Sequence, residues 1–295
     1  MKREHDSINR SMEEAGMGAD SPDRVKLMEL FSIRDSCPEC SGIISGELDM
    51  KMIVSKRKQG VPLEYLLGVA GFMERLFYCT PDTLIPRADT SLLVRTAISA
   101  VRRLQDSGER ALEVIEIGTG CGNIAVMVAS LSGNTVIHAS DISEKAIRVA
   151  RKNIKAYNLQ GRIILKCGDM FEPFRGRSPV DIIICNPPYI PSGSLNNLGS
   201  EIIDHEPVLA LDAGAYGVDI FMRLIRDSVD FLRPGGILAF EFGERQEKMI
   251  ERMLKRSRNY HKVIFHEYNG VPRVASAVRK GDGEAKTGTD KPAEK

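Results

Sequence analysis

Asn186-Pro187-Pro188-Tyr189 is the segment whose residue types point most directly to chemistry. Two consecutive prolines fix φ and donate no backbone N–H, so the chain here is stiff and extended. The side-chain oxygen of Asn186 and the backbone oxygen of Pro187 can accept both hydrogens of a planar NH2 group, and the Tyr189 ring can stack on the plane that carries this group. The tetrapeptide therefore predicts a clamp for an NH2 group, with these four residues as candidate catalytic residues.

An NH2 group held in this way becomes a better nucleophile. The NH2 groups of adenine, cytosine, glutamine and asparagine react poorly because the nitrogen lone pair is delocalised. Hydrogen bonds to both hydrogens favour a pyramidal nitrogen, and a fixed position in line with a donor turns a chance encounter into a positioned attack. No strong general base is then required, and none is obvious near the tetrapeptide. The alternative reading is a proline-stiffened exit from a strand with no chemical role.

A glycine-rich loop, Gly118-Thr119-Gly120-Cys121-Gly122, lies between an expected strand and an expected helix. Glycines let the chain turn sharply and approach a ligand without Cβ clashes. The spacing differs from the G-x-G-x-x-G of dinucleotide binders, and no Lys-Ser/Thr pair follows, which excludes a phosphate-binding P-loop. The loop by itself is also compatible with a purely structural turn.

Carboxylates follow the next two expected strands and strengthen the case for a ligand. Asp141 ends the second strand, where it can accept both hydroxyl groups of a ribose. Its alternative role is a helix cap, but Ser143 is better placed for that. Asp169 ends the third strand and can face an adenine amino group, while Met170 can form an apolar wall for the ring. Since ligands of open α/β sheets bind at this edge, the pattern predicts a nucleoside cofactor without phosphates.

The elements that would position these groups form an α/β pattern with a Rossmann-like sheet. Apolar strands alternate with helices after residue 111, which predicts a parallel sheet covered on both faces. The expected strands are 112–117, 135–140, 162–167, 180–185 and 237–242, followed by 263–267 and 273–278. No helix separates the last two strands, so they are expected to form a hairpin at one edge.

Residues 1–60 are expected to form helices. Ser21 can cap a helix with Pro22 in its first turn. The apolar face of that helix is expected at Val25, Met28 and Phe31, with Leu27 and Leu30 beside it. A later helix begins near Asp49 and ends in the basic run 56–58 before Gly60, as helix ends do, rather than marking a nucleic-acid patch. A third amphipathic helix is expected over 90–104.

Composition limits the function classes. The chain has 41 Lys and Arg against 40 Asp and Glu, so no global basic field gathers nucleic acid. No apolar run is long enough for a membrane span and no secretory signal is recognisable. Cys37 and Cys40 form a C-x-x-C, but no second pair or nearby histidine completes a zinc site, so metal or redox use is disfavoured and no metal is expected. The compartment is expected to be the reducing cytoplasm.

Several segments resemble the release factor glutamine N5-methyltransferase family, within the seven-stranded class of S-adenosylmethionine-dependent enzymes. The resemblance covers about residues 10–281. It is carried by Pro62–Gly68, Thr83–Thr90, the glycine loop, Asn186–Ile190, Glu206–Leu211, and Gly235-Gly236 ahead of Glu241. The expected edge hairpin is what separates a methyltransferase sheet from a plain dinucleotide fold.

The resemblance implies S-adenosyl-L-methionine as cofactor and the glutamine of a Gly-Gly-Gln loop in a peptide chain release factor as methyl acceptor. By motif, Gly118 to Gly122, Asp141, Met170 and Asn186 match cofactor contacts, and Asn186 to Tyr189 match the glutamine clamp. The implied organisation is a helical substrate-docking domain (1–67), a linking hairpin (68–80), a methyltransferase domain (81–281) and a disordered tail (282–295).

Three other readings remain open. One is the same chemistry on a ribosomal-protein glutamine, although Ile85–Thr90 favours the release-factor branch. Another is an N6-adenine nucleic-acid methyltransferase, which the near-neutral charge and the lack of a basic target-recognition domain disfavour. The last is a non-catalytic scaffold that binds S-adenosylmethionine, which the intact clamp disfavours. We expect a monomer with a protein substrate and no direct contact with membrane or nucleic acid.

Overall fold

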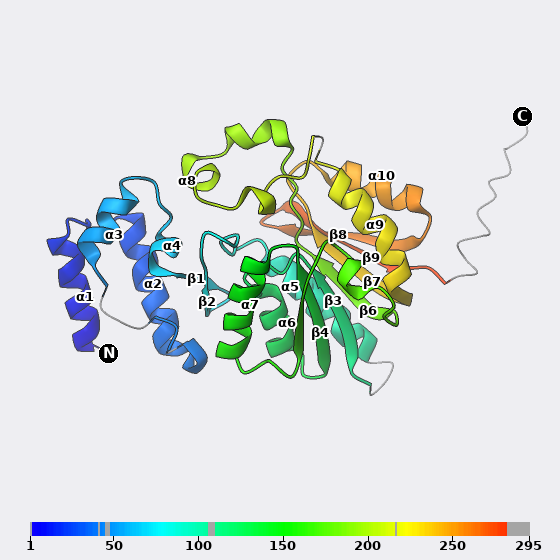
Figure 1. Cartoon of the computed structure of the whole chain (residues 1–295), viewed down its shortest axis with the longest axis horizontal. Helices are drawn as coiled ribbons and strands as arrows, with labels where there is room; N and C mark the ends of the chain where they lie inside the picture. The colour runs from blue at the N-terminus through cyan, green and yellow to red at the C-terminus, as the bar shows by residue number, and fades with distance from the viewer. Residues whose placement is uncertain (1, 41, 45–47, 106–109, 216, 282–295) are drawn as a thin grey trace, which may run out of the picture.

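The computed structural model describes residues 2–40, 42–44, 48–105, 110–215 and 217–281 (Figure 1). The expected tail, 282–295, lies outside these residues. The N-terminal helices lie at one end of the molecule, the large sheet lies at the other, and a small hairpin lies between them (Figure 1). Within the described part, no helix is long and apolar enough to cross a membrane.

The N-terminal region is helical, as predicted. It contains α1 (Lys2–Glu14), α2 (Pro22–Ser36), the 3-10 turn η1 (Pro38–Cys40), α3 (Met50–Arg57) and α4 (Leu63–Leu67). Ser21 caps α2 by accepting from the Arg24 N–H at 3.2 Å, and Asp49 caps α3.

The buried face of α2 differs from the expected one. Leu27, Leu30 and Phe31 are buried, whereas Val25 is 60% exposed. The reason is the neighbour of the helix: a Cβ on Gly71 in the hairpin would lie 3.1 Å from Leu30, so this glycine lets α2 pack closely through Leu30. The helical periodicity of the apolar residues alone did not determine which of two adjacent faces of α2 is buried.

Cys37 and Cys40 form a disulfide across η1, a pairing that was not predicted from the sequence. One 3-10 turn brings their Cα atoms to 5.2 Å, within the range that a disulfide spans. The sulfur of Cys40 also lies 3.4 Å from the hydroxyl of Tyr157.

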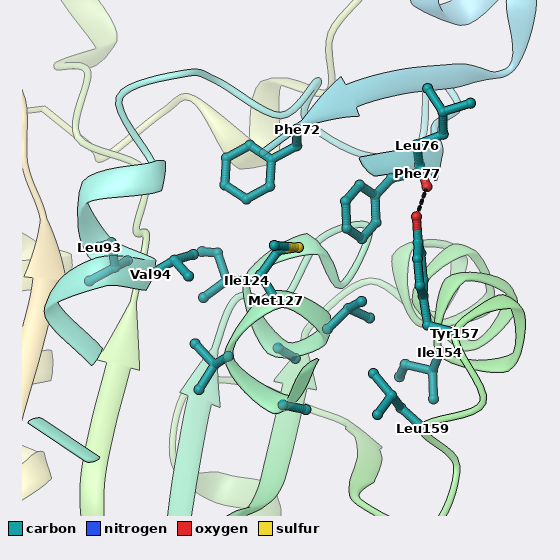
Figure 2. Close-up of a cluster of buried hydrophobic side chains, with 14 of the residues drawn as sticks. Phe72, Leu76, Phe77, Leu93, Val94, Ile124, Met127, Ile154, Tyr157 and Leu159 are labelled. Atoms are coloured by element: carbon teal, nitrogen blue, oxygen red, sulfur yellow. Dashed lines mark hydrogen bonds between the residues drawn. The ribbon is translucent and has the colours of Figure 1, made fainter. Parts of the chain in front are cut away.

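The predicted hairpin links the two regions. Strands β1 (Val69–Phe72) and β2 (Arg75–Tyr78) pair antiparallel. Phe77 packs against Tyr157 with ring centroids 5.3 Å apart, and the Tyr157 hydroxyl donates to the Leu76 carbonyl (Figure 2). The hairpin is therefore attached to the large domain through buried contacts.

The large domain is built on a seven-stranded sheet of order β5-β4-β3-β6-β7-β9-β8. Its strands are β3 (Leu112–Ile117), β4 (Thr135–Asp141), β5 (Ile163–Cys167), β6 (Val180–Cys185), β7 (Leu232–Glu241), β8 (Tyr260–Tyr268) and β9 (Val271–Arg279). The first five are parallel, while β9 runs antiparallel to both β7 and β8. The predicted Rossmann-like sheet with its edge hairpin is confirmed.

Helices cover both faces of this sheet (Figure 1). On one face lie α5 (Ser91–Gln105), α6 (Asn123–Leu131) and α7 (Glu144–Ala156), and on the other lie α9 (Asp219–Phe231) and α10 (Glu247–Ser257). Strand β6 is buried along its whole length because Ile182 and Ile184 face the first layer while Ile183 and Cys185 face the second.

The connection from β6 to α9 is long and irregular. It contains the 3-10 turns η3 (Ser192–Asn197) and η4 (Val208–Ala210), with the short helix α8 (Ser200–Ile203) between them. A short 3-10 turn, η2 (Glu172–Phe174), follows β5. We call residues 190–214 the roof segment, because Pro207, Leu209, Ala210 and Asp212 from it line the cavity described below.

Candidate active site

A cavity of about 400 Å³ lies at the carboxyl ends of β3, β4, β5 and β6. Its walls bring together segments that are far apart in the sequence. The residues predicted for the site that line it are Gly118, Thr119, Gly120, Cys121, Asp141, Asp169, Met170, Asn186, Pro187 and Pro188. Gly122 and Tyr189 are not among its lining residues.

The glycine loop turns from β3 into α6 through left-handed backbone. Gly118 and Gly120 have φ of 70° and 54°, which glycine adopts without strain. Gly122 also has positive φ, but a Cβ there would lie 3.2 Å from the Cβ of Ala150. Gly118 and Gly120 thus shape the cavity wall, whereas Gly122 permits α6 to pack closely on α7.

Asp141 lies at the end of β4 and ties the glycine loop to it. One carboxylate oxygen accepts from the Gly120 N–H at 2.9 Å, and the other accepts from the Ser143 N–H at 2.9 Å. Ser143 is the cap of α7, as predicted, and accepts from the Ala146 N–H. A carboxylate offers about four lone-pair sites. Asp141 therefore keeps acceptor capacity toward the cavity, as binding of a ribose hydroxyl would require.

Glu116, which was not among the predicted site residues, lies buried beneath the glycine loop. Its Oε2 accepts from the Thr119 hydroxyl at 2.9 Å, while Oε1 has no hydrogen-bond partner within the described part of the chain. Burial raises the pKa of Glu116 to about 8. The sequence shows a glutamate at the end of an apolar strand, just before the glycine loop, and this was a signal for the residue. Its burial could not be predicted, because it depends on how the loop packs.

Asp169 and Met170 form another wall of the cavity. Met170 is buried, which suits the predicted apolar wall. The carboxylate of Asp169 already pairs with Arg223 of α9 at 2.6 Å. Arg223 also lines the cavity and was missed, because an arginine on the polar face of an amphipathic helix carries no local signal.

Asn186 follows directly after β6 and faces Thr90. Its Nδ2 donates to the Thr90 hydroxyl at 3.3 Å, and both residues line the cavity. Thr90 is buried at the start of α5, behind Asn186. The side-chain oxygen of Asn186 is then left available to a group in the cavity, as the clamp requires.

Tyr189 lies outside the cavity wall, in contrast to the expected stacking position. Its hydroxyl accepts from Arg273 at 3.2 Å, and the Arg273 guanidinium lies 5.5 Å from the ring centroid. Gly243 admits the ring, since a Cβ there would lie 3.0 Å from it. Burial raises the pKa of Tyr189 to about 12, so its phenol is neutral near pH 7. In this structure the Tyr189 side chain packs beside Gly243 and Arg273.

The roof segment is fixed to the loop before α5 by an ion pair between a buried glutamate and a partly exposed arginine. Glu206 is 5% exposed and pairs with Arg87, which lines the cavity. The other oxygen of Glu206 accepts from the Ile85 N–H at 3.3 Å. In the sequence, the segments 83–90 and 206–211 were noted only as parts of the family resemblance. Their pairing with each other beside the cavity was not predicted.

The cavity thus combines groups suited to two ligands. Glycine backbone, two carboxylates and an apolar wall fit a nucleoside, and the Asn186 oxygen beside Pro187 and Pro188 fits an NH2 group. Across the described residues, no group of three or more His, Cys, Asp or Glu side chains has a geometry that could hold a metal ion. The fold and this site define a methyltransferase of the seven-stranded, Rossmann-like class.

Comparison with known proteins narrows the class. Residues 96–214 match the methyltransferase small domain. The chain is 37% identical over 218 residues to the release factor glutamine methyltransferase of Gloeobacter violaceus, covering 74% of each protein. It is 34% identical over 228 residues to that of Moorella thermoacetica, covering 77% of this chain and 78% of the relative. The chain belongs to the release factor glutamine methyltransferase family, as its motifs predicted, and is an enzyme.

A solved structure of another protein has a similar fold. The catalytic domain of hMettl16, in complex with a MAT2A 3′UTR hairpin, superposes with a TM-score of 0.56 at 16% identity. The superposition covers 90% of this chain and 96% of that domain. At this identity the likeness bears on the fold alone.

Proposed function

We propose that this enzyme transfers the methyl group of S-adenosyl-L-methionine to the side-chain amide nitrogen of a glutamine in the Gly-Gly-Gln loop of a peptide chain release factor. The observation that carries the proposal is that the Asn186-Pro187-Pro188 segment lines the same cavity as the glycine loop and Asp141. Its relatives bear the name of this activity. Such a substrate is consistent with a cytoplasmic enzyme.

The residues that would hold the cofactor are those whose geometry fits a nucleoside. Asp141 would accept the ribose hydroxyls with the lone pairs that Gly120 and Ser143 leave free. Met170 would pack on the adenine ring and Asp169 would face its amino group. The backbone from Gly118 to Cys121 would approach the remainder of the cofactor, because left-handed glycines leave room there.

The chemistry supplied by the bound cofactor is an activated methyl group on a positively charged sulfur. The Asn186 oxygen and the Pro187 carbonyl would accept the two hydrogens of the glutamine amide and would hold its nitrogen toward the part of the cavity that the cofactor would fill. Bound there, the cofactor would supply its methyl group to this nitrogen and leave as the neutral thioether, and the amide nitrogen would release one proton to solvent. Positioning and desolvation account for the rate without a strong base.

The N-terminal helices would serve as a docking domain for the release factor. Arg57 of α3 supports this role because it joins three elements. It donates to Asp23 at 2.9 Å, to the Val61 carbonyl at 2.7 Å and to Glu201 of α8 at 3.0 Å. Arg57 thereby holds the helical domain and the roof segment together. A protein bound to the helical domain would therefore lie near the cavity that the roof segment lines.

Methyl transfer to competing acceptors tests the proposal. The full-length enzyme is incubated with methyl-labelled S-adenosylmethionine and a release factor, a ribosomal-protein mixture, or DNA and RNA oligonucleotides. We expect label on the release factor, placed on the glutamine by mass spectrometry of its peptides. Faster labelling of oligonucleotides or of a ribosomal protein would overturn the assignment.

A matched acceptor sharpens this test. A release factor with Gln→Asn in the loop keeps a primary amide but is one methylene shorter. Its nitrogen would lie about 1.5 Å short of the methyl group, and a displacement of about 1 Å can cost roughly 10²-fold in rate. Equal labelling of both acceptors would show that the clamp does not position the amide as proposed.

A further inference from the structure

The orientation of the Asn186 amide decides whether the clamp works. An amide presents an oxygen acceptor on one side and an NH2 donor on the other. If the NH2 side faced the cavity, it would meet the hydrogens of the acceptor amide rather than bind them. Some neighbour must therefore hold the NH2 side of Asn186 away from the cavity.

Thr90 is in contact with Asn186, but it cannot choose the orientation alone. Its hydroxyl accepts from Asn186 Nδ2 at 3.3 Å. A threonine hydroxyl can donate as well as accept, so it can pair equally well with the amide oxygen after a flip. The orientation becomes unique only if the hydroxyl proton of Thr90 is committed to another acceptor.

Glu241 is the residue placed to take that proton. It ends β7 directly after Phe240, which pairs with Cys185, the residue before Asn186. Glu241 is 0% exposed, and neither of its carboxylate oxygens has a hydrogen-bond partner among the described residues. The hydroxyl groups of Thr90 and Tyr189 lie near it and lower its pKa, which makes them its candidate donors. A buried carboxyl with so few partners is costly, and an ionised carboxylate can only accept.

We propose that Glu241 is a positioning residue that fixes the Asn186 amide through the Thr90 hydroxyl. The carboxylate accepts the Thr90 proton, the Thr90 oxygen then accepts from Asn186 Nδ2, and the Asn186 oxygen faces the NH2 group to be methylated. The inference rests on the proposed function and extends it, because it names the residue that orients the clamp.

The surroundings of Glu241 make this arrangement sensitive to pH. Burial, together with the negative charge of Asp89, raises its pKa to about 7, while Arg273 and the hydroxyl groups of Thr90 and Tyr189 act in the opposite direction. The buried thiol of Cys185 also lies near it. A protonated Glu241 can donate to the Thr90 hydroxyl as well as accept from it, so the Thr90 proton is no longer committed to one direction. The clamp should therefore be correctly oriented less often as pH falls through this pKa.

Variants of Glu241 and Thr90 test the relay in the full chain. For Glu241→Gln we expect kcat for the release factor to fall roughly 10²-fold, the effect of misplacing a reacting group. The dissociation constant of S-adenosylmethionine should be unchanged, and the acidic limb of the kcat–pH profile should disappear. Thr90→Val should lower kcat similarly, and Thr90→Ser should restore most of it because the hydroxyl is kept.

A buried carboxylate far from the cavity serves as the control. Asp181 lies near the amino end of β6, the end away from Asn186, is 4% exposed and pairs with Arg110 and Arg233. Asp181→Asn should lower the melting temperature but leave the acidic limb in place. The inference is overturned if Glu241→Gln keeps the wild-type kcat and acidic limb, if Thr90→Val matches Thr90→Ser, or if Asp181→Asn also removes the limb.

A second readout separates this inference from the proposed substrate. If the wild-type enzyme failed to methylate a release factor, the proposed function would be lost, but the relay can be observed without turnover. The side-chain 15N–1H resonances of Asn186 should report one hydrogen-bonded proton in the wild type and change in Glu241→Gln. Unchanged resonances in that variant would contradict the relay.

Discussion

Asn153 of α7 donates from its side-chain nitrogen to the Cys121 carbonyl at 2.7 Å, inside the glycine loop. The same side chain pairs with both backbone groups of Tyr78, accepting at 2.7 Å and donating at 2.9 Å. Asn153 is 0% exposed. One buried amide therefore joins the hairpin that carries the N-terminal helices to the loop that shapes the cofactor cavity.

Asn153→Ala should couple a loss of stability to a loss of cofactor affinity. The change leaves buried backbone groups of Tyr78 and Cys121 without partners, each costing about 1–3 kcal/mol. We expect a lower free energy of unfolding by denaturant titration and a weaker S-adenosylmethionine affinity by calorimetry. Lys155→Ala, on the exposed side of the same helix, is the control. Loss of stability with full affinity would mean that Asn153 does not support the loop.

Asn186→Ala should abolish turnover while most cofactor affinity remains. The Asn186 oxygen acts on the acceptor nitrogen, and losing one such interaction lowers the rate by roughly 10²–10³-fold. Single-turnover kinetics with labelled cofactor, beside a binding titration, separate the two effects. A variant that keeps more than about a tenth of the wild-type rate would remove Asn186 from the catalytic role.

Asp141→Ala should weaken S-adenosylmethionine binding. A hydrogen bond to a charged group contributes about 1.5–3 kcal/mol, which corresponds to roughly 10- to 100-fold in affinity. Part of the loss arises because the Gly120 N–H also loses its acceptor. Calorimetry measures the change. If the affinity stays at the wild-type value, Asp141 only fastens the glycine loop to β4.

The buried carboxyl groups Glu116 and Glu241 should make the protein less stable as pH rises from 7 to 9. Their pKa values are raised to about 8 and about 7, mainly by burial. A raised pKa means that the folded state binds the proton more tightly than the unfolded state. The resulting stability is present at low pH and is lost as pH rises through these values.

Denaturant titrations of the wild type and Glu116→Gln at pH 7 and pH 9 check this sign. The window lies above the titration of His138 and His266, whose pKa values burial lowers. We expect a smaller loss of unfolding free energy in the variant, because glutamine carries no proton to release. An equal loss in both proteins would contradict the role of Glu116.

Much of the fold could be predicted from local patterns. Strands β3 and β6 have the predicted bounds, because short apolar runs between turn residues are recognisable from their own sequence. Strand β7 begins at Leu232 rather than at the predicted residue 237. Its pairing with β6 is irregular between Val180 and Ile182, and this irregularity allows Pro234 and the two glycines after it to lie within the strand. The glycine loop and the double proline were equally visible, because each restricts its own backbone.

Contacts between distant residues were decided by the tertiary structure. Nothing near Arg223 in the sequence indicates that it pairs with Asp169, and nothing near Glu206 indicates Arg87. Tyr189 was expected in the cavity, but the space beside Gly243 and the charge of Arg273 hold its ring elsewhere. The periodicity, capping and backbone restrictions of a segment depend on its own residues. The partner of a polar side chain depends on how the layers pack, which no single segment encodes.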